Sequence, residues 1–221
     1  SYTRLSKVTG LSDIGATCIK FNNYNNTLVI GYSDGNVDLV ENNTVINVAD
    51  IKNKAITSSK TINSIYFINQ YAYLACGFGI VVFDTQQQTI ADTYYIGTNG
   101  TYLNVRDITS DGKNIYAATD NGIYEAPLNS PNLADYNNWT RKTIEVGGLT
   151  LPTGIYNTIA SINGKVFANF SKHITNNAWM QDTVYESANG GATWSVFTGS
   201  TNINKIESSN NHLLMCAQYA V

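Results

Sequence analysis

The feature that most constrains the fold is a repeated strand–turn–strand pattern. Three copies align on a glycine before the second strand, at Gly35, Gly79 and Gly122, with intervals of 44 and 43 residues. The clearest copy, residues 115–126, holds an Asp-Asn-Gly turn, and such turns supply the positive φ angles that tight hairpins need. The flanking runs alternate with period 2 and are rich in Val, Ile, Tyr and Thr, which indicates strands and excludes a solenoid of helical repeats.

The spacing of these hairpins predicts a β-propeller. A short apolar strand precedes each hairpin, and two further copies begin near residues 155 and 203. A period of about 40–50 residues with several strands per repeat is typical of propeller blades. We therefore expect an all-β chain of four-stranded antiparallel blades, with about four to five repeats that form part of a larger ring. The expected repeats are residues 10–50, 60–97, 101–145, 153–198 and 203–221.

Several segments carry more local expectations. Residues 1–9 are predicted to be a strand that could close a last blade, and residues 137–144 to be the outer strand of the third repeat. Residues 147–154 contain glycines and a proline and are predicted to be a loop. The fifth repeat reaches only its second strand, which predicts an open arc whose uncovered end faces could self-associate.

Composition excludes some classes of partner. The 221-residue chain has a net charge of −3 with 13% charged residues and has no basic stripe, which argues against nucleic acid. It has no apolar run of about 18 residues, the length of a membrane span. The chain shows no charged-then-apolar leader, so a signal peptide either was removed or never existed. Cys18, Cys76 and Cys216 lie in apolar strands without CxxC spacing, which predicts three buried thiols rather than a disulfide or zinc site.

The residue types that catalysis needs are scattered. His173 and His212 lack the spacing of metal ligands, and three arginines in unrelated segments do not suggest the triad of a sialidase. The candidate carboxylates mostly follow strands, where capping of their own turn is the expected role. They are Asp34, Asp107, Asp111 and Asp120. We therefore predict a protein that is not an enzyme and has no catalytic, cofactor-binding or metal site.

Propeller geometry indicates where a ligand could bind. The turns between second and third strands share one face with the connections between blades, and this face would present Asp34, Phe78, Tyr102, Asp120 and Asn121. Phe78 and Tyr102 could stack on a sugar ring or a peptide. The alternative is that these aromatic rings only cover the central channel.

A separate turn motif has a structural interpretation. Residues 187–194 resemble an Asp-box, with Ser187, Asn189 in the usual aspartate position, Gly191 and Trp194. In this hairpin turn the polar side chains bond the turn backbone, glycine takes positive φ, and tryptophan packs into the blade.

Two motifs support a resemblance to a known family. Cys76-Gly-Phe-Gly-Ile-Val81 and Leu133-Ala-Asp-Tyr-Asn-Asn-Trp139 resemble the N-terminal propeller of the PorZ family, accessory proteins of the type IX secretion system of Bacteroidetes. The resemblance implies a protein with two propellers and a sorting domain that works beside a sortase at the outer membrane, in attaching anionic lipopolysaccharide to cargo. It also implies a periplasmic or outer-membrane location, with secretion-system proteins or a surface glycan such as lipopolysaccharide as partners.

A more distant resemblance supports an alternative. Residues 27–31 and 115–119 are similar to the core of regulator-propeller repeats, with Val29 and Tyr116 where that family usually has tryptophan. This resemblance implies the periplasmic ligand-sensing domain of a hybrid two-component histidine kinase.

Overall fold

The computed structural model describes residues 4–142, 145–146, 149–150, 152–172 and 181–217. The chain forms antiparallel sheets in which consecutive strands are neighbours. The first sheet contains β1 (Ala16–Asn22), β2 (Thr27–Tyr32), β3 (Val37–Glu41) and β4 (Thr44–Val48). The second sheet contains β5 (Ile62–Ile68), β6 (Tyr71–Cys76), β7 (Gly79–Asp84) and β8 (Thr89–Tyr94).

The later sheets repeat this order. The third contains β9 (Val105–Ser110), β10 (Asn114–Thr119), β11 (Gly122–Pro127) and β12 (Thr140–Arg141). The fourth contains β15 (Tyr156–Ile162), β16 (Lys165–Phe170), β17 (Gln181–Ser187) and β18 (Ser195–Thr201). The fifth contains β19 (Ile203–Ser209) and β20 (His212–Ala217), and β13 (Glu145–Val146) pairs with β14 (Leu149–Thr150). The described connections contain the short helices α1 (Asp50–Asn53), η1 (Thr98–Gly100) and η2 (Tyr136–Asn138).

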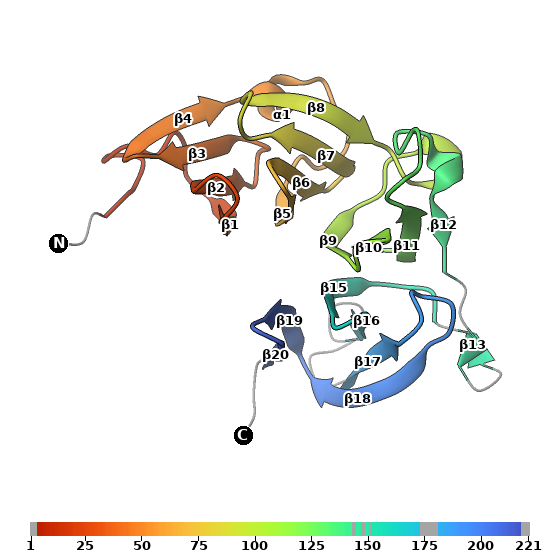
Figure 1. The fold of residues 1–221 in the computed structure, drawn as a ribbon. Helices are drawn as coiled ribbons and strands as arrows, with labels where there is room; N and C mark the ends of the chain where they lie inside the picture. The colour runs from red at the N-terminus through yellow and green to blue at the C-terminus, as the bar shows by residue number, and fades with distance from the viewer. Residues whose placement is uncertain (1–3, 143–144, 147–148, 151, 173–180, 218–221) are drawn as a thin grey trace.

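The sheets are arranged as the blades of a propeller. Figure 1 shows them around an open arc, with the first strand of each sheet, from β1 to β19, on its inner side. The predicted all-β fold of four-stranded antiparallel blades is confirmed. An apolar core is buried between each pair of neighbouring sheets. The two faces of a blade are therefore shielded from solvent by the blades on either side of it.

An extra residue lies near the start of each inner strand. The register of every inner strand shifts at this position, as in a β-bulge. In β1, β5 and β15 the side chain there reaches the inner strand of the next sheet: Thr17 Oγ1 lies 2.5 Å from the Ile62 carbonyl oxygen. Asn63 Nδ2 donates to Val105 O at 2.6 Å, and Asn157 Nδ2 donates to Ile203 O at 2.7 Å. The bulges therefore link the blades.

Two local predictions are wrong, and a third is confirmed over a shorter range. Residues 4–9 contain no strand, because Ser6 O accepts hydrogen bonds from the backbone N–H of Thr9 and Leu11, which folds the segment into a turn. The predicted outer strand at 137–144 is present as β12, which pairs with β11, but its first residues lie in η2, which Asp135 caps. The predicted loop at 147–154 includes β14, which pairs with β13. Residues 1–3, 143–144, 147–148 and 151 lie outside the described residues.

The three cysteines differ in burial. Cys76 is buried and Cys18 is half-buried, but Cys216 is exposed, so the prediction of three buried thiols is wrong for Cys216. Cys216 lies in β20, in a sheet of two described strands that is covered on one face by the fourth sheet. An apolar strand is therefore not sufficient for burial here.

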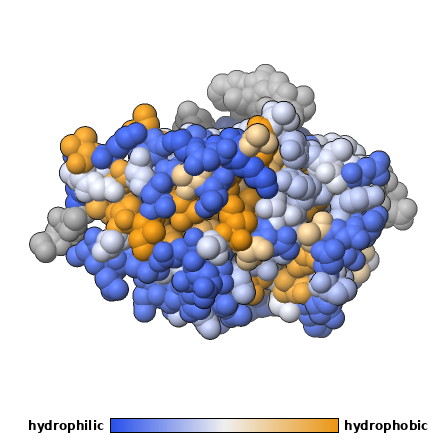
Figure 2. Space-filling view, turned by 90° about the horizontal axis from the view of Figure 1, so that it is seen from above, coloured by the Kyte–Doolittle hydropathy of each residue, from blue (hydrophilic) through white to orange (hydrophobic). Residues whose placement is uncertain are grey.

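Apolar surface also remains on the outer side of the arc. Figure 2 shows hydrophobic residues gathered over β4 and the adjoining part of β8, bordered by hydrophilic ones. Ile46 of β4, Ile56 and Ile90 of β8 are partly buried and pack against the core between the first two sheets. This apolar surface is therefore largely the outer edge of the hydrophobic core between the first and second sheets.

Candidate functional site

The candidate site is a loop face, formed by the turns between second and third strands and by the connections between sheets. Hydrogen bonds join each turn to the connection beside it. Thr61 Oγ1 donates to Ser33 O at 2.9 Å, and Asp120 N donates to Asn104 O at 3.2 Å. The segments that carry the predicted ligand residues are therefore held by backbone contacts, which favours a preformed surface.

An aromatic cluster occupies this face beside the core between the first and second sheets. The ring centroid of Phe78 lies 6.2 Å from that of Tyr95 and 6.3 Å from that of Tyr102, and Tyr95 and Tyr102 are 5.4 Å apart. Tyr102 is 43% exposed, whereas Phe78 is 1% exposed. The expectation that Phe78 stacks on a ligand is therefore wrong: neighbouring rings cover it, and Phe78 supports Tyr102, which is the ring available for stacking.

Asp34 belongs to a group of alternating charges. Lys52 Nζ lies 2.7 Å from Asp34 Oδ2 and also forms an ion pair with Asp13. The hydrogen bond to Asp13, with that to Asp34, raises the pKa of Lys52 to about 12. The same lysine, with the backbone N–H of Ile14, lowers the pKa of Asp13 well below its usual range. Asp34 also accepts a hydrogen bond from Asn36 N at 3.0 Å, so it caps its own turn.

Asp120 and Asn121 lie on the turn of the third sheet. Asp120 forms an ion pair with Arg106, the bulge residue of β9, and accepts a hydrogen bond from Asn104 Nδ2 at 3.0 Å. The Asn121 carbonyl oxygen accepts a hydrogen bond from Arg141 Nε at 2.6 Å. Tyr102 lies in the connection between β8 and β9, which Asp120 contacts through Asn104, whereas Asp34 lies on the turn of the first sheet, two blades from Asp120. The predicted residues thus form two groups on one face rather than one pocket.

The Asp-box segment forms the tight turn expected from its sequence. Ser187 Oγ accepts a hydrogen bond from Gly191 N at 2.9 Å, and Asn189 Oδ1 accepts one from Thr193 N at 2.9 Å. Gly191 has a φ of 78°, and the Trp194 indole N–H donates to Gly191 O at 3.1 Å. Trp194 is buried in the core between the third and fourth sheets, so these contacts are structural.

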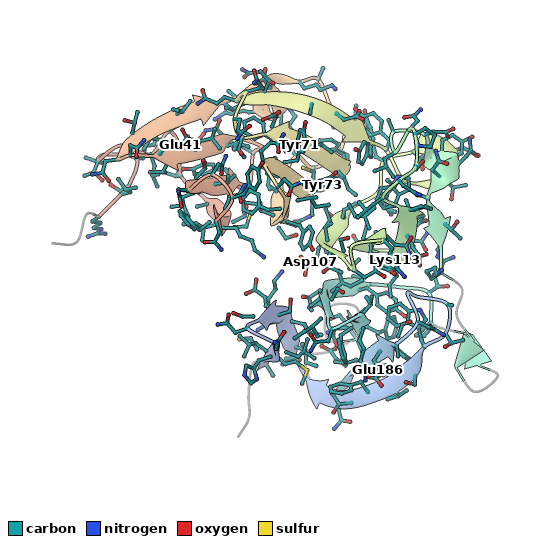
Figure 3. All side chains as sticks on the ribbon, in the orientation of Figure 1. Glu41, Tyr71, Tyr73, Asp107, Lys113 and Glu186 are labelled. Carbon is teal, nitrogen blue, oxygen red and sulfur yellow. The ribbon has the colours of Figure 1, made fainter. Side chains whose placement is uncertain are left out.

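The sequence did not reveal the role of Asp107. This residue lies in β9 at the inner side of the arc, near the fourth sheet (Figure 3). Its Oδ2 accepts hydrogen bonds from Thr158 Oγ1 at 2.8 Å, Ile159 N at 3.1 Å and Lys205 Nζ at 2.8 Å. Asp107 therefore joins three sheets. The sequence feature that could have indicated this role is the position of Asp107 within a predicted strand, where a carboxylate cannot cap a turn.

The described residues offer little for catalysis. Within the described ranges, no three His, Cys, Asp or Glu side chains are placed to hold a metal ion. His212 is exposed at the start of β20, and His173 lies outside the described residues. A search of the same residues found no helix long and apolar enough to cross a membrane.

The radial four-stranded sheets define a β-propeller module. The chain belongs to a family described as the type IX secretion PorZ N-terminal β-propeller domain, whose model matches residues 1–140. No curated protein matches the sequence.

Solved structures share this fold. PorZ, an essential surface component of the type IX secretion system of Porphyromonas gingivalis, is 20% identical with a TM-score of 0.62. The match covers 96% of this chain and 31% of PorZ. The extracellular domain of the hybrid two-component system BT3049 from B. thetaiotaomicron is 16% identical with a TM-score of 0.66, covering 96% of this chain and 29% of that domain. The extracellular domain of the hybrid two-component system BT4673 from B. thetaiotaomicron is 15% identical with a TM-score of 0.61. That match covers 89% of this chain and 24% of that domain.

Proposed function

We propose that the chain is a non-catalytic binding module of a PorZ-type protein at the periplasmic or outer-membrane surface. In this role the loop face binds another secretion-system protein or a surface glycan during attachment of type IX cargo. The observation that carries the proposal is the family match over residues 1–140, because this part of the chain contains Tyr102, Asp120 and the rest of the predicted ligand face.

The contacts of the loop face support binding rather than turnover. Asp34 and Asp120 are held in ion pairs with Lys52 and Arg106, so their carboxylates are occupied. Tyr102 adds an exposed aromatic surface on the same face. A proton-transfer catalyst needs an acid or base within reach of its substrate, and paired carboxylates are poor candidates for that role.

The test is replacement of the full-length gene by variants in its own host. Loss of the protein should leave type IX cargo unattached to the cell surface, measured as the ratio of cell-bound to released cargo. A sensor domain, the alternative function, should instead change transcription and leave this ratio unaltered. Unchanged cargo attachment together with altered transcription would contradict the proposal.

A second test concerns catalysis. The purified protein should release no product from a panel of sialosides and other glycosides. Turnover that disappears on Asp34→Asn, Asp107→Asn or Asp120→Asn would contradict the non-catalytic proposal.

A further inference from the structure

The hollow between η1 and η2 adjoins the loop face, because Arg141 in its lining donates a hydrogen bond to Asn121 O. It has a volume of about 290 Å³ and lies between the connection after the second sheet and the segment before β12. Its apolar lining comes from Ile96, Tyr124 and Trp139, which are all buried. Its wall includes Tyr136 and Trp139, which belong to the sequence motif before β12. Neither residue is part of the aromatic cluster or the ion pairs of the loop face.

The exposed aromatic ring in this wall is held in place. Tyr136 is 36% exposed, and Gly100 packs against it so closely that a Cβ at Gly100 would lie 3.3 Å from Tyr136 Cδ1. Asp135 Oδ1 accepts hydrogen bonds from Asn137 N at 2.9 Å and Asn137 Nδ2 at 2.8 Å, which fixes η2. The Trp139 indole N–H donates to Leu133 O at 2.8 Å. Because these side chains are already held in place, ligand binding would cost little conformational entropy, which favours affinity.

The polar part of the lining offers hydrogen bonds. Asn99 and Asn137 are exposed residues whose amides line the hollow, together with Arg141. Asn137 uses its Nδ2 within η2, so its Oδ1 remains as an acceptor for a ligand hydroxyl. Arg141 donates from Nε to Asn121 O and from Nη2 to Thr153 Oγ1, which leaves Nη1 as a donor. The residues that line the hollow include no carboxylate.

We propose that this hollow binds one hexopyranose ring. A pyranose has an apolar C–H face and a rim of hydroxyl groups, which matches an exposed tyrosine ring beside neutral amides. The volume lies at the small end of ligand pockets, about 300–1,000 Å³, and so suits a single ring. The inference deepens the proposed function, because it names a ligand class for one part of the loop face.

The experiment is saturation-transfer NMR on the full-length protein. The probes are methyl β-D-glucopyranoside and methyl β-D-galactopyranoside, with D-glucitol as a polyol that has similar hydroxyl groups and no ring. At least one glycoside should receive saturation at its ring protons with a Kd of about 1 mM, typical of weak single-site ligands, and glucitol should receive none. Tyr136→Ala should reduce the effect at least about fivefold, equivalent to roughly 1 kcal/mol.

Two variants guard against trivial explanations. Tyr136→Phe keeps the ring and should retain binding, and Tyr24→Ala removes a 60% exposed ring from the β1–β2 turn and should leave binding unchanged. Equal saturation in Tyr136→Ala, equal saturation of glucitol, or no saturation of either glycoside would overturn the inference. Binding of inorganic phosphate or acetate without either glycoside would also overturn it, and would make the hollow an anion site.

The outcome can be separated from that of the proposed function. Absence of sugar binding together with a cargo defect in loop-face variants would overturn only the sugar site. Sugar binding together with normal cargo attachment in the gene-deletion strain would overturn only the secretion role.

Discussion

Lys205 Nζ lies 2.8 Å from Asp107 Oδ2, and this contact joins β9 of the third sheet to β19 of the fifth across 98 residues of sequence. The Asp107 side chain is 5% exposed, and the same oxygen accepts hydrogen bonds from Thr158 Oγ1 and Ile159 N of the fourth sheet. The Asp107 carboxylate therefore connects the third, fourth and fifth blades at the inner side of the arc. This connection matters because each blade is shielded from solvent by its neighbours.

Removal of this carboxylate should destabilise the chain. Asp107→Ala leaves the Ile159 N–H and the Lys205 ammonium without this acceptor, whereas the Thr158 hydroxyl can still donate to Ile206 O. A buried unpaired group costs about 1–3 kcal/mol. We expect a loss of about 3 kcal/mol in the free energy of unfolding, measured by urea denaturation. The matched control is Glu207→Ala, whose half-exposed carboxylate lies 3.7 Å from Lys20 and should contribute less than about 0.5 kcal/mol. Equal losses in both variants would argue against a linking role for Asp107.

Trp194 should be the most sensitive position of the Asp-box turn. Trp194→Ala removes a buried ring from the core between the third and fourth sheets and should cost about 3–5 kcal/mol, the usual range for deletion of a core aromatic. Val196→Ala, two residues later and 58% exposed, is the control and should be nearly neutral. A thermal melting temperature that does not fall in Trp194→Ala would show that the turn is not fixed by its tryptophan.

Asp38 should make the free energy of unfolding sensitive to acid. Burial alone would raise its pKa, but hydrogen bonds from Tyr32 Oη, Ser12 N and Asn47 Nδ2 lower it below the ordinary 3.8. Because the folded-state pKa is the lower one, the stabilisation is complete above the unfolded value and is lost as the pH falls through the folded value. Unfolding free energies measured between pH 5 and pH 2 should therefore fall more steeply for the native sequence than for Asp38→Asn. Parallel curves would contradict this assignment.

The thiols should differ in reactivity. Burial raises the pKa of Cys18 to about 11 and also raises that of Cys76, so both are protonated at pH 8 and shielded from reagents. Iodoacetamide should modify Cys216 first in the folded 221-residue chain and the other two only after denaturation, as followed by peptide mass spectrometry. Early labelling of Cys76 would show that the core between the first two sheets opens readily.

Much of the fold could be predicted from local sequence, because Asn-Gly turns and period-2 alternation specify hairpins within a few residues. The bulges at Thr17 and Asn63 could not, since an extra residue is recognisable only from its contact with the next sheet. The burial of Phe78 likewise depends on Tyr95 and Tyr102, which come from a connection 17–24 residues later. The hollow at Tyr136 requires η1 and η2 to meet, which no local pattern encodes.

The most direct test of the binding role uses point variants of the loop face in the native host. Tyr102→Ala combined with Asp120→Asn changes an exposed ring and a paired carboxylate on that face, and Tyr24→Ala is the control for loss of an exposed tyrosine elsewhere. The measurement is the fraction of type IX cargo bound to the cell surface, at protein levels matched by immunoblot. We predict that this fraction falls severalfold in the loop-face variant and is normal in Tyr24→Ala; normal attachment in both variants would contradict a binding role for the loop face.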